Sequence, residues 1–318
     1  MKQRIITGAI FAVLFIPGVI LGGFYFYALG LIVTYVCTFE LLNMFYKKNE
    51  GLKIMRFIVP VFSSLFFTLM HYKIKQDPSF FMIIDGKLRL VNLTSIGIAQ
   101  SFGYIFGILI IALAFIILLF AVISIFMKNP GKSAINMIFS FIYGGLMLSM
   151  AFSVENINIS HTIRFEFPGV IFGYVYLIVV LTDVFAYFFG SKFGKHKLCP
   201  TISPKKSVEG AIFGSIGSSL IGTLYVYIFN LIDVDYSRGA LHIIIVYVII
   251  FAISLLVSII SQFGDLFAST LKREYEIKDY GNILPGHGGL LDRFDSTALA
   301  GSIFFVVIFI IKFVLLFN

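Results

Sequence analysis

The sequence predicts an all-α protein, a polytopic transmembrane helical bundle of about nine spans with a cytoplasmic N-terminus and an outside C-terminus. Hydrophobic residues make up 59% of its 318 residues and charged residues only 13%, whereas a soluble domain carries about 25% charged residues. The apolar residues form continuous runs rather than alternating with polar ones, which favours helices over barrel strands. In such a chain the net charge of +8 indicates cytoplasmic loops and anionic lipid or substrate, not nucleic acid.

A helix needs about 20 apolar residues to cross the hydrocarbon of a bilayer. Nine runs are long enough, at residues 5–22, 24–46, 54–71, 100–127, 134–152, 168–190, 210–232, 240–264 and 296–317. The first run follows two basic residues, as a signal peptide would. No small-residue cleavage site follows it, so we expect a retained span. The first two runs meet at Gly22-Gly23.

The distribution of basic residues supports this count and orientation. An eight-span count would place one set of polar loops on the wrong face. The loop at 72–99 is a predicted extracytoplasmic insertion with turn signals at Asp77-Pro78 and Asp85-Gly86; it holds four of the seven remaining basic residues, and the positive-inside rule does not count long loops well. Nine spans place 17 of the 24 Lys and Arg residues in cytoplasmic segments: Lys2, Arg4, Lys47, Lys48, Lys53, Arg56, Lys128, Lys132, Lys192, Lys195, Lys197, Lys205, Lys206, Lys272, Arg273, Lys278 and Arg293.

We divide the chain into an N-terminal transmembrane bundle, residues 1–160, and a C-terminal catalytic transmembrane domain, residues 161–318, with cytoplasmic loops at 191–209 and 265–295. The two cysteines form no disulfide framework or metal-finger spacing. The seventh run carries a ladder of small residues, which lets another helix approach closely. Packing within the bundle is the favoured interpretation and a homodimer seam the alternative. The ladder is Gly210, Gly214, Ser218 and Gly222.

Several acids lie where a membrane protein rarely places them without a function. Asp183 lies about two turns inside the sixth run, and the alternative to a functional role is a hydrogen bond to a neighbouring helix. Glu40 lies near the cytoplasmic end of the second run, where snorkelling or a lysine partner is the alternative. Asp265 ends the eighth run, and Asp292 and Asp295 open the ninth on one helical face. They suit either helix capping or a magnesium site.

Two cytoplasmic segments hold most of the remaining polar chemistry. Residues 190–210 carry five lysines before the start of a helix, a pattern that suits an anionic ligand or an ordinary positive-inside loop. Residues 269–295 mix both signs of charge with a Pro-Gly-His-Gly-Gly turn. The glycines of that turn allow a phosphate to approach the backbone closely. His287 would bind phosphate, pass a proton or be structural.

The second segment resembles the signature of the phosphatidate cytidylyltransferases, also called CDP-diacylglycerol synthases. The upstream stretch is similar to the same family in Asp183-x-x-Ala186-Tyr187-x-x-Gly190, Gly194-Lys195 and Ser203-Pro204-Lys205-Lys206-Ser207-x-Glu209-Gly210, with Ser207 where Thr is more usual. The resemblance covers residues from about 168 to the end. All fixed positions of the signature are filled, in the order Ser269-x-Leu271-Lys272-Arg273, Lys278-Asp279-x-Gly281, Leu284-Pro285-x-His287-Gly288-Gly289-Leu290-x-Asp292-Arg293-Phe294-Asp295.

The resemblance implies a magnesium-dependent transfer of CMP from CTP to phosphatidic acid in the cell membrane, with the site at the cytoplasmic face. It implies Asp265 and Asp292 as leading magnesium ligands, then Asp295 and Asp183, with potassium as a second candidate ion. The implied catalytic residues are Asp265, Lys272, Arg273, His287, Asp292 and Arg293. The implied substrate-binding residues are Ser203, Pro204, Lys205, Lys206, Ser207, Lys278, Gly288 and Gly289.

Two other functions stay open at this point. A polyisoprenol kinase similar to this family would transfer the γ-phosphate of CTP to a lipid alcohol. An ion-coupled transporter would use Asp183 and Glu40 as coupling acids, but inverted repeats with broken helices, which would support it, are not detectable in the sequence. The pattern of the CDP-alcohol phosphotransferases is absent from the sequence.

Overall fold

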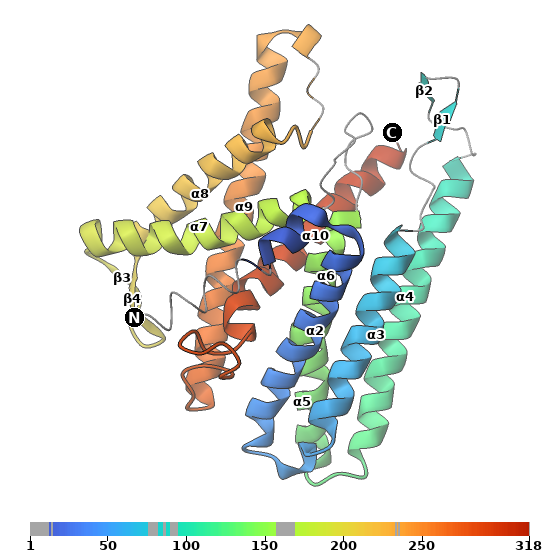
Figure 1. The fold of residues 1–318 in the computed structure, drawn as a ribbon, viewed down its shortest axis with the longest axis vertical. Coiled ribbons are helices and arrows are strands. Elements are labelled where there is room, and N and C mark those ends of the chain that lie inside the picture. Colours follow the sequence, from blue (N-terminus) through green and yellow to red (C-terminus); the bar gives the residue numbers. More distant parts are fainter. Residues whose placement is uncertain are drawn as a thin grey trace.

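The computed structural model describes the backbone of residues 13, 15–75, 82–84, 87–89, 95–156, 169–232, 234 and 236–317. Side chains are described for these residues except 73–75, 82–84, 87–89, 95–106, 238 and 312–317. Eight helical segments of this part of the chain are long and apolar enough to cross a membrane. They are formed by α2 (Gly23–Tyr46), α3 (Met55–Lys75), α4 (Ser95–Ser124), α5–η3–α6 (Pro130–Ser140, Phe141–Leu146, Met147–Ser153), α7 (Val170–Phe193), α8 (Val208–Ile228), α9 (Ala240–Glu274) and α10 (Leu291–Phe317) (Figure 1).

The predicted fold class is confirmed, and these eight segments match eight of the nine predicted spans. Half of the predicted span at 5–22 lies outside the described residues, and residues 15–21 of the other half are helical. The break before α2 falls at Gly22-Gly23, as expected, and both glycines have positive φ angles, 58° and 56°. The orientation of the two termini stays a prediction.

The helix α9 is longer than the sequence predicted. It was expected to end at 264 but continues to Glu274, so the first residues of the predicted polar segment 269–295 are helical. Ala268 is buried and Leu271 packs against the core, which gives the extension an apolar face. Lys272 and Arg273 lie in its last turn, where cations are favoured by the helix dipole.

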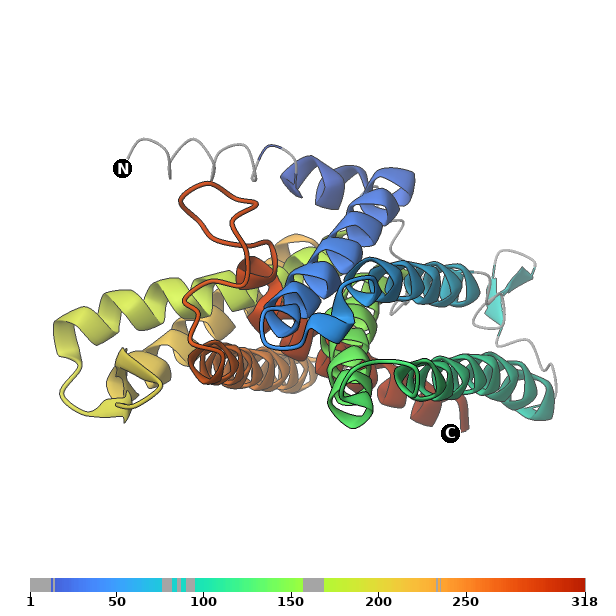
Figure 2. The same ribbon diagram turned by 90° about the horizontal axis from the view of Figure 1, so that it is seen from below.

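Two groups of helices lie on either side of α10. Figures 1 and 2 show α2 to α6 on one side and α7, α8 and α9 on the other, with α10 running between them and packing on α6, α7 and α9. The predicted division into 1–160 and 161–318 stays a prediction, since α10 contacts elements from both parts of the chain.

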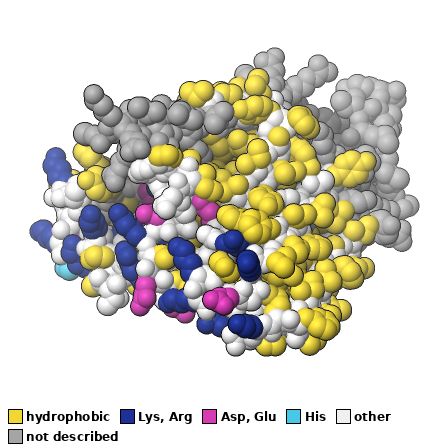
Figure 3. Space-filling view, turned by 60° about the horizontal axis from the view of Figure 1, so that its bottom comes forward, with side chains coloured by type: hydrophobic (Ala, Val, Ile, Leu, Met, Phe, Trp, Pro, Cys, Tyr) yellow, Lys and Arg dark blue, Asp and Glu magenta, His cyan; other side chains and the backbone are white. Residues whose placement is uncertain are grey.

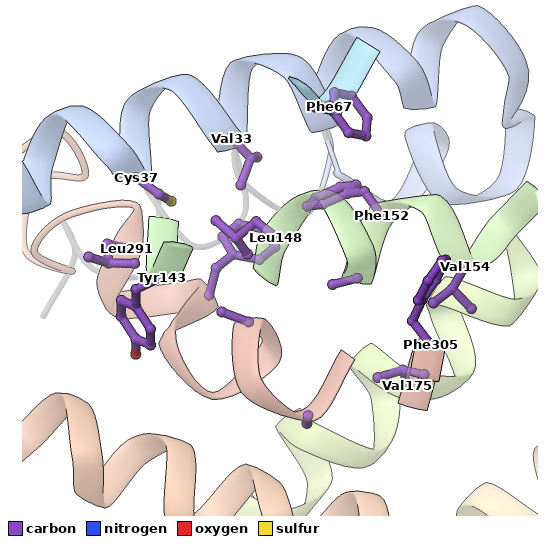
Figure 4. Packing of buried hydrophobic residues seen from close by; sticks show 14 of the residues in the cluster. Val33, Cys37, Phe67, Tyr143, Leu148, Phe152, Val154, Val175, Leu291 and Phe305 are labelled. Carbon is purple, nitrogen blue, oxygen red and sulfur yellow. The ribbon is translucent and has the colours of Figure 1, made fainter. Parts of the chain in front are cut away.

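Aromatic rings fill the space where the two groups meet. Phe152 stacks on Phe172 with ring centroids 4.6 Å apart, and lies 5.3 Å from Phe26 and 5.9 Å from Phe294. Such pairs contribute about 0.5–1.5 kcal/mol each beyond area burial. Figure 4 shows Phe152 among buried residues from α2, α3, α6, α7 and α10. Close packing of this kind, rather than exclusion from water, holds helices together in lipid.

The small-residue ladder of α8 packs within the chain, against α7. A Cβ on Gly210 would lie 2.6 Å from the carbonyl oxygen of Ala186, and one on Gly214 would lie 2.9 Å from that of Thr182. The favoured interpretation of the ladder, packing within the bundle, is therefore confirmed. A homodimer stays a prediction.

Several connections between helices meet at one end of the molecule. Asn49, before the short helix η1 (Glu50–Leu52), donates from Nδ2 to Ser133 Oγ at 3.0 Å, and Lys48 Nζ donates to the carbonyl of Glu274 at 3.3 Å. Figure 3 shows Lys and Arg side chains gathered over this end beside a broad hydrophobic surface. The fold thus separates a charged end from an apolar flank, as a membrane requires.

Short strands occur only in connecting segments of the described chain. In loop 72–99, β1 (Met82–Ile84) pairs antiparallel with β2 (Lys87–Arg89). The predicted turn residues Asp77-Pro78 and Asp85-Gly86 lie outside the described residues. Between α7 and α8, β3 (Lys197–Cys199) pairs antiparallel with β4 (Ser203–Ser207). This second hairpin carries part of the candidate site and was not predicted from the sequence.

Candidate active site

A polar cavity of about 260 Å³ lies between the β3–β4 hairpin and the helices α7, α8 and α9. Helix α7 contributes an acid, the strand β4 contributes two lysines and two serines, and α9 contributes an acid and an amide. The loop 190–210, which the sequence analysis linked to anions, thus forms one wall. The lining residues are Asp183, Ala186, Tyr187, Leu198, Ser203, Lys205, Lys206, Ser207, Ala211, Gln262 and Asp265.

The strand β4 carries its lysines directly into a helix N-terminus. Ser207 ends the strand and is the N-cap of α8, since its Oγ accepts a hydrogen bond from the Gly210 backbone N–H at 3.2 Å. Pro204 has no backbone N–H to donate. It is tolerated in β4 because both strands of a two-stranded hairpin are edge strands. Lys205 and Lys206 therefore stand beside the positive end of a helix dipole, a place suited to an anion.

Glu209 fixes the other end of this hairpin. Its Oε2 accepts hydrogen bonds from the backbone N–H groups of Lys195 at 3.1 Å and His196 at 3.2 Å, and its Oε1 lies 2.6 Å from His196 Nδ1. Gly194 is the C-cap of α7, and its N–H donates to the Gly190 carbonyl at 3.1 Å in a position that leaves no room for a Cβ. These contacts hold the basic strand over the C-terminal end of α7.

Opposite charges face each other across the cavity. The ammonium of Lys206 contacts the carboxylate of Asp265, and both side chains are about one quarter exposed. Asp183 opens into the same space from α7 and interacts electrostatically with both. Gln262 lies one turn before Asp265, and its Nε2 donates to Ser215 Oγ at 2.7 Å and to the carbonyl of Ala211 at 3.2 Å. The amide thereby ties α9 to α8 at the cavity wall.

The turn in the segment 269–295 is built by its glycines. The His287 N–H donates to the Leu284 carbonyl at 2.9 Å, and the Leu284 N–H donates to the Gly288 carbonyl at 2.9 Å. Gly286 and Gly288 have φ angles of 77° and 84°, which a residue with a Cβ rarely adopts. Pro285 before Gly286 matches a turn that needs positive φ at its third position. Arg293 Nη2 closes the loop by donating to the His287 carbonyl at 2.8 Å.

Asp292 is the centre of a hydrogen-bond network at the start of α10. Its Oδ1 accepts from Lys272 Nζ at 2.9 Å, and its Oδ2 accepts from the backbone N–H groups of Tyr280 and Gly289, both at 2.9 Å. Its side chain is only 4% exposed. The Gly289 bond fits the capping interpretation of this acid. The network ties the loop between α9 and α10 to both helices.

Asp295 lies one turn further along α10 and is buried. Its Oδ1 accepts from the Ser296 backbone N–H at 2.7 Å, and its Oδ2 lies 3.6 Å from Lys272 Nζ. Lys272 thus serves two carboxylates at once. Its ammonium also lies 5.1 Å from the ring centroid of Tyr280, within range of a cation–π interaction.

Glu40 reaches this loop from α2, about 250 positions away in sequence. Its Oε1 accepts from the Leu290 N–H at 3.1 Å and its Oε2 from the Leu291 N–H at 2.8 Å. Glu40 is 2% exposed. The sequence had suggested snorkelling or a lysine partner as the alternative to a functional role. Among the described residues the structure shows neither for Glu40, which instead caps the N-terminus of α10 from another helix.

Tyr280 is a second residue whose structural role was not predicted from the sequence. Its hydroxyl donates to the Ala268 carbonyl at 3.1 Å. Burial, followed by the neighbouring carboxylates of Asp295 and Asp292, raises its pKa well above the ordinary tyrosine value. The hydroxyl therefore stays protonated and keeps its role as a donor. Its only sequence signal was an aromatic residue within a charged loop.

The predicted site residues fall into three sets. Six line the cavity: Asp183, Ser203, Lys205, Lys206, Ser207 and Asp265. A second set forms the network around Asp292: Lys272, Gly288, Gly289, Asp295, His287 and Arg293. The third set, Pro204, Arg273 and Lys278, is exposed and lines neither. In the second set, His287 keeps a buried Nδ1 without a hydrogen-bond partner.

The charged side chains around the cavity interact with those of the network around Asp292. Asp265 interacts electrostatically with Asp183 on one side and with Asp295 on the other. The cavity residues and the residues around Asp292 therefore share one electrostatic field. Four carboxylates, with Asp292, lie in this field together with four cations, Lys205, Lys206, Lys272 and Arg293, so the charges of these side chains balance. Among the described residues no three His, Cys, Asp or Glu side chains form a metal group by themselves. One or two carboxylates with substrate phosphates, the arrangement magnesium prefers, fit this set.

Comparisons with known proteins agree with the resemblance seen in the sequence. A family model described as "Cytidylyltransferase family" matches residues 2–311. A phosphatidate cytidylyltransferase of Staphylococcus aureus (strain COL) is 33% identical over 301 residues, covering 93% of this chain and 94% of the relative. Relatives with the same name from Staphylococcus saprophyticus and Bacillus subtilis (strain 168) are 32% and 33% identical and cover 93% of this chain each.

Proposed function

The chain belongs to the cytidylyltransferase family and is a nucleotidyltransferase with multiple membrane spans, and from this premise we propose that it is a phosphatidate cytidylyltransferase. It transfers CMP from CTP to phosphatidic acid and yields CDP-diacylglycerol and pyrophosphate for phospholipid synthesis. Three relatives that carry this name share about a third of its residues over almost their whole length.

The observation that carries this proposal is the polar cavity at the charged end of the helices. Both reactants are anionic, so a site that joins them must concentrate positive charge and hold them in line. Lys205 and Lys206 stand beside the N-terminus of α8, and acids that suit a cation lie opposite. The cavity borders transmembrane helices, so a lipid phosphate and a soluble nucleotide would reach it from different sides.

In this reaction a phosphate oxygen of phosphatidic acid attacks the α-phosphorus of CTP. The bond between that phosphorus and the bridging oxygen of the β-phosphate breaks, and pyrophosphate leaves with that electron pair. Lys205 and Lys206 bind and neutralise the phosphates, and Ser203 orients them. Lys206, which contacts the Asp265 carboxylate, would contact a phosphate oxygen in its place, and Asp265 would then be available to hold a cation. His287 lies in the loop before α10 and Arg293 in the first turn of α10, where they would contact the phosphates from the other set of site residues.

We propose Mg²⁺ as the cofactor, with Asp265 as a ligand and Asp183, Asp292 and Asp295 as candidates for further ligands. Potassium is a second candidate ion. When bound, the cation neutralises charge on the phosphates during transfer. Asp265 and Asp183 are open to the cavity, whereas Asp292 is engaged with Lys272 and two backbone N–H groups. A cation at Asp292 therefore requires Lys272 to move away from that carboxylate.

The proposed location is the cell membrane, with the cavity at its cytoplasmic face. CTP is a cytosolic nucleotide, so the lysine-rich strand has to face the cytosol. The basic residues predicted to be cytoplasmic include Lys205, Lys206 and Lys272, which is the distribution that the positive-inside rule expects.

The products of the reaction test this proposal directly. Purified protein is incubated with Mg²⁺, CTP labelled at the α- or the γ-phosphate, and either phosphatidic acid or, in a parallel reaction, a polyisoprenol. We expect the α label in a CDP-lipid and the γ label in pyrophosphate. A polyisoprenol kinase would instead place the γ label in a phospholipid and release CDP. Protein that moves solute across vesicles and never consumes CTP would support the transporter alternative and contradict the proposal.

A further inference from the structure

A second cavity, almost wholly apolar, adjoins the polar one between α8 and α9. Its volume is about 430 Å³, within the ~300–1,000 Å³ of small-molecule sites. One stripe of each helix forms its walls, Ile212 and Ile216 on α8 and Leu255 and Ile259 on α9. These residues recur at four-residue spacing, so they share a face of their helix. We call this space the α8–α9 groove.

The groove and the polar cavity share a boundary. Leu198, Ala211 and Gln262 line both. Gln262 is fixed there by its hydrogen bonds to the Ala211 carbonyl and to Ser215 Oγ. A molecule that extends from the cavity past Gln262 therefore leaves a charged surface and enters an apolar one without crossing a helix.

The floor of the groove presents no free polar group. Ser215, the other polar lining residue, is 5% exposed, and its Oγ accepts from Gln262 and, at 3.2 Å, from Ser258 Oγ. Ser258 in turn is bonded to Thr182 Oγ1 at 2.7 Å and Ser218 Oγ at 3.1 Å. These hydroxyls satisfy one another between α7, α8 and α9. A hydrocarbon chain would therefore meet no unsatisfied polar atom on the floor.

The walls are open toward the side of the bundle. Ile212, Ile216 and Phe263 are 53%, 42% and 61% exposed, as expected of residues that face lipid. From Gln262 to Leu255 the groove follows seven residues of α9, about 10 Å at the rise of an α-helix. Half of the hydrocarbon thickness is ~15 Å. The groove thus runs from the charged end of the molecule over roughly two thirds of one leaflet.

We infer that the α8–α9 groove binds an acyl chain of the phosphatidic acid substrate while its phosphate occupies the polar cavity. The inference rests on the proposed function, and it assigns the groove to the substrate rather than to bulk lipid. The continuity of the two spaces at Gln262 carries it, because one molecule with an anionic head and an apolar chain matches both. Occupation of the groove makes the enzyme select substrates with chains long enough to reach Leu255.

Blocking the far end of the groove tests this inference. Leu255→Trp places an indole at that end, whereas Leu256→Trp adds the same group one residue along, at a 44% exposed position that does not line the groove. KM is measured for dioleoyl and dihexanoyl phosphatidic acid and for CTP. We expect Leu255→Trp to raise the dioleoyl KM at least about fivefold, because the displaced part of the chain stays in hydrocarbon and loses only its packing contacts with the groove. The dihexanoyl and CTP values should stay within about twofold, and Leu256→Trp should change none of the three.

If Leu255→Trp does not give a monodisperse protein, Ile216→Trp replaces it, with Leu224→Trp as the control on the lipid-facing side of α8. An unchanged ratio of dioleoyl to dihexanoyl KM in a folded groove variant would assign the groove to bulk lipid and overturn the inference alone. Wild-type protein that forms no CDP-lipid from either substrate would overturn the proposed function, and with it the assignment of the groove to phosphatidic acid.

Discussion

Replacing Glu40 with alanine should loosen the start of α10 without removing any group from the polar cavity. Glu40 lies on α2, and its two carboxylate oxygens accept the backbone N–H groups of Leu290 and Leu291 at 3.1 and 2.8 Å. The first N–H groups of a helix have no partner within the helix. In the variant these two donors remain buried, because Leu290 is 9% and Leu291 is 0% exposed.

The expected loss of stability follows from these two bonds. A buried donor left without a partner costs about 1–3 kcal/mol, so two cost about 2–6 kcal/mol. Burial of the Glu40 carboxylate itself is unfavourable in the wild type and offsets part of this. We expect a net loss of about 2–4 kcal/mol. In chains somewhat shorter than this one, each kcal/mol shifts the thermal midpoint by ~2–4 °C, so the midpoint should fall by at least about 4 °C.

Thermal unfolding in detergent, followed by intrinsic tyrosine fluorescence, measures this shift. Glu50→Ala is the matched control, because Glu50 is 84% exposed and its ion pair with an exposed Lys128 is long at 3.9 Å. This substitution should shift the midpoint by less than about 1 °C. The KM for CTP should stay close to the wild-type value at temperatures where the variant is folded. A Glu40→Ala midpoint equal to that of the control would refute the capping role derived from the geometry.

Three further substitutions have expected outcomes. Asp265→Asn should lower kcat/KM at least about 100-fold at every Mg²⁺ concentration, with Glu50→Gln unchanged; near-normal turnover would contradict a metal role. Asp292→Asn should lower the free energy of unfolding by about 1.5–3 kcal/mol. A double-mutant cycle with Lys272→Met should give a coupling energy above about 1 kcal/mol, and additive effects of the two substitutions would contradict the ion pair. Gly288→Ala should lower the free energy of unfolding by about 1–3 kcal/mol, because φ is 84° at this position and a Cβ would lie 3.0 Å from Asp292 Oδ2. Gly131→Ala is the control, since a Cβ there has open space, and it should have no such effect. Equal effects of the two substitutions would contradict backbone strain at Gly288.

The spans were predictable because lipid imposes a length and an apolar composition on each helix. Boundaries set by packing were not. The helix α9 runs ten residues past its predicted end because Ala268 and Leu271 pack against the core, and this contact exists only in the folded bundle. The β3–β4 hairpin was missed for a related reason: its strand Ser203–Ser207 is polar and is held by Glu209 and by α8, not by an apolar alternation of its own.

The candidate site was found in part. The lysines were recognisable because a stretch of fixed polar positions is itself a local pattern, and Asp265 because it is an acid at the end of an apolar run. The arrangement of the acids was not. Sequence spacing set Asp292 and Asp295 on one helical face, as observed, but it could not show that Lys272 already serves both carboxylates. It also gave no sign that Asp183 and Asp265 share a cavity whereas Asp292 faces the loop.

The polar stretch 269–295 illustrates what the sequence determines and what the tertiary structure determines. The sequence by itself determined the all-α membrane class, the small-residue contact of α8 and the family, because each depends on residues that are near one another in the chain. Only the tertiary structure decided that Glu40 caps α10, that the hairpin lysines face Asp265, and that an apolar groove continues from the polar cavity. Those facts depend on contacts between helices distant in sequence, where each partner alone has no pattern that names the other.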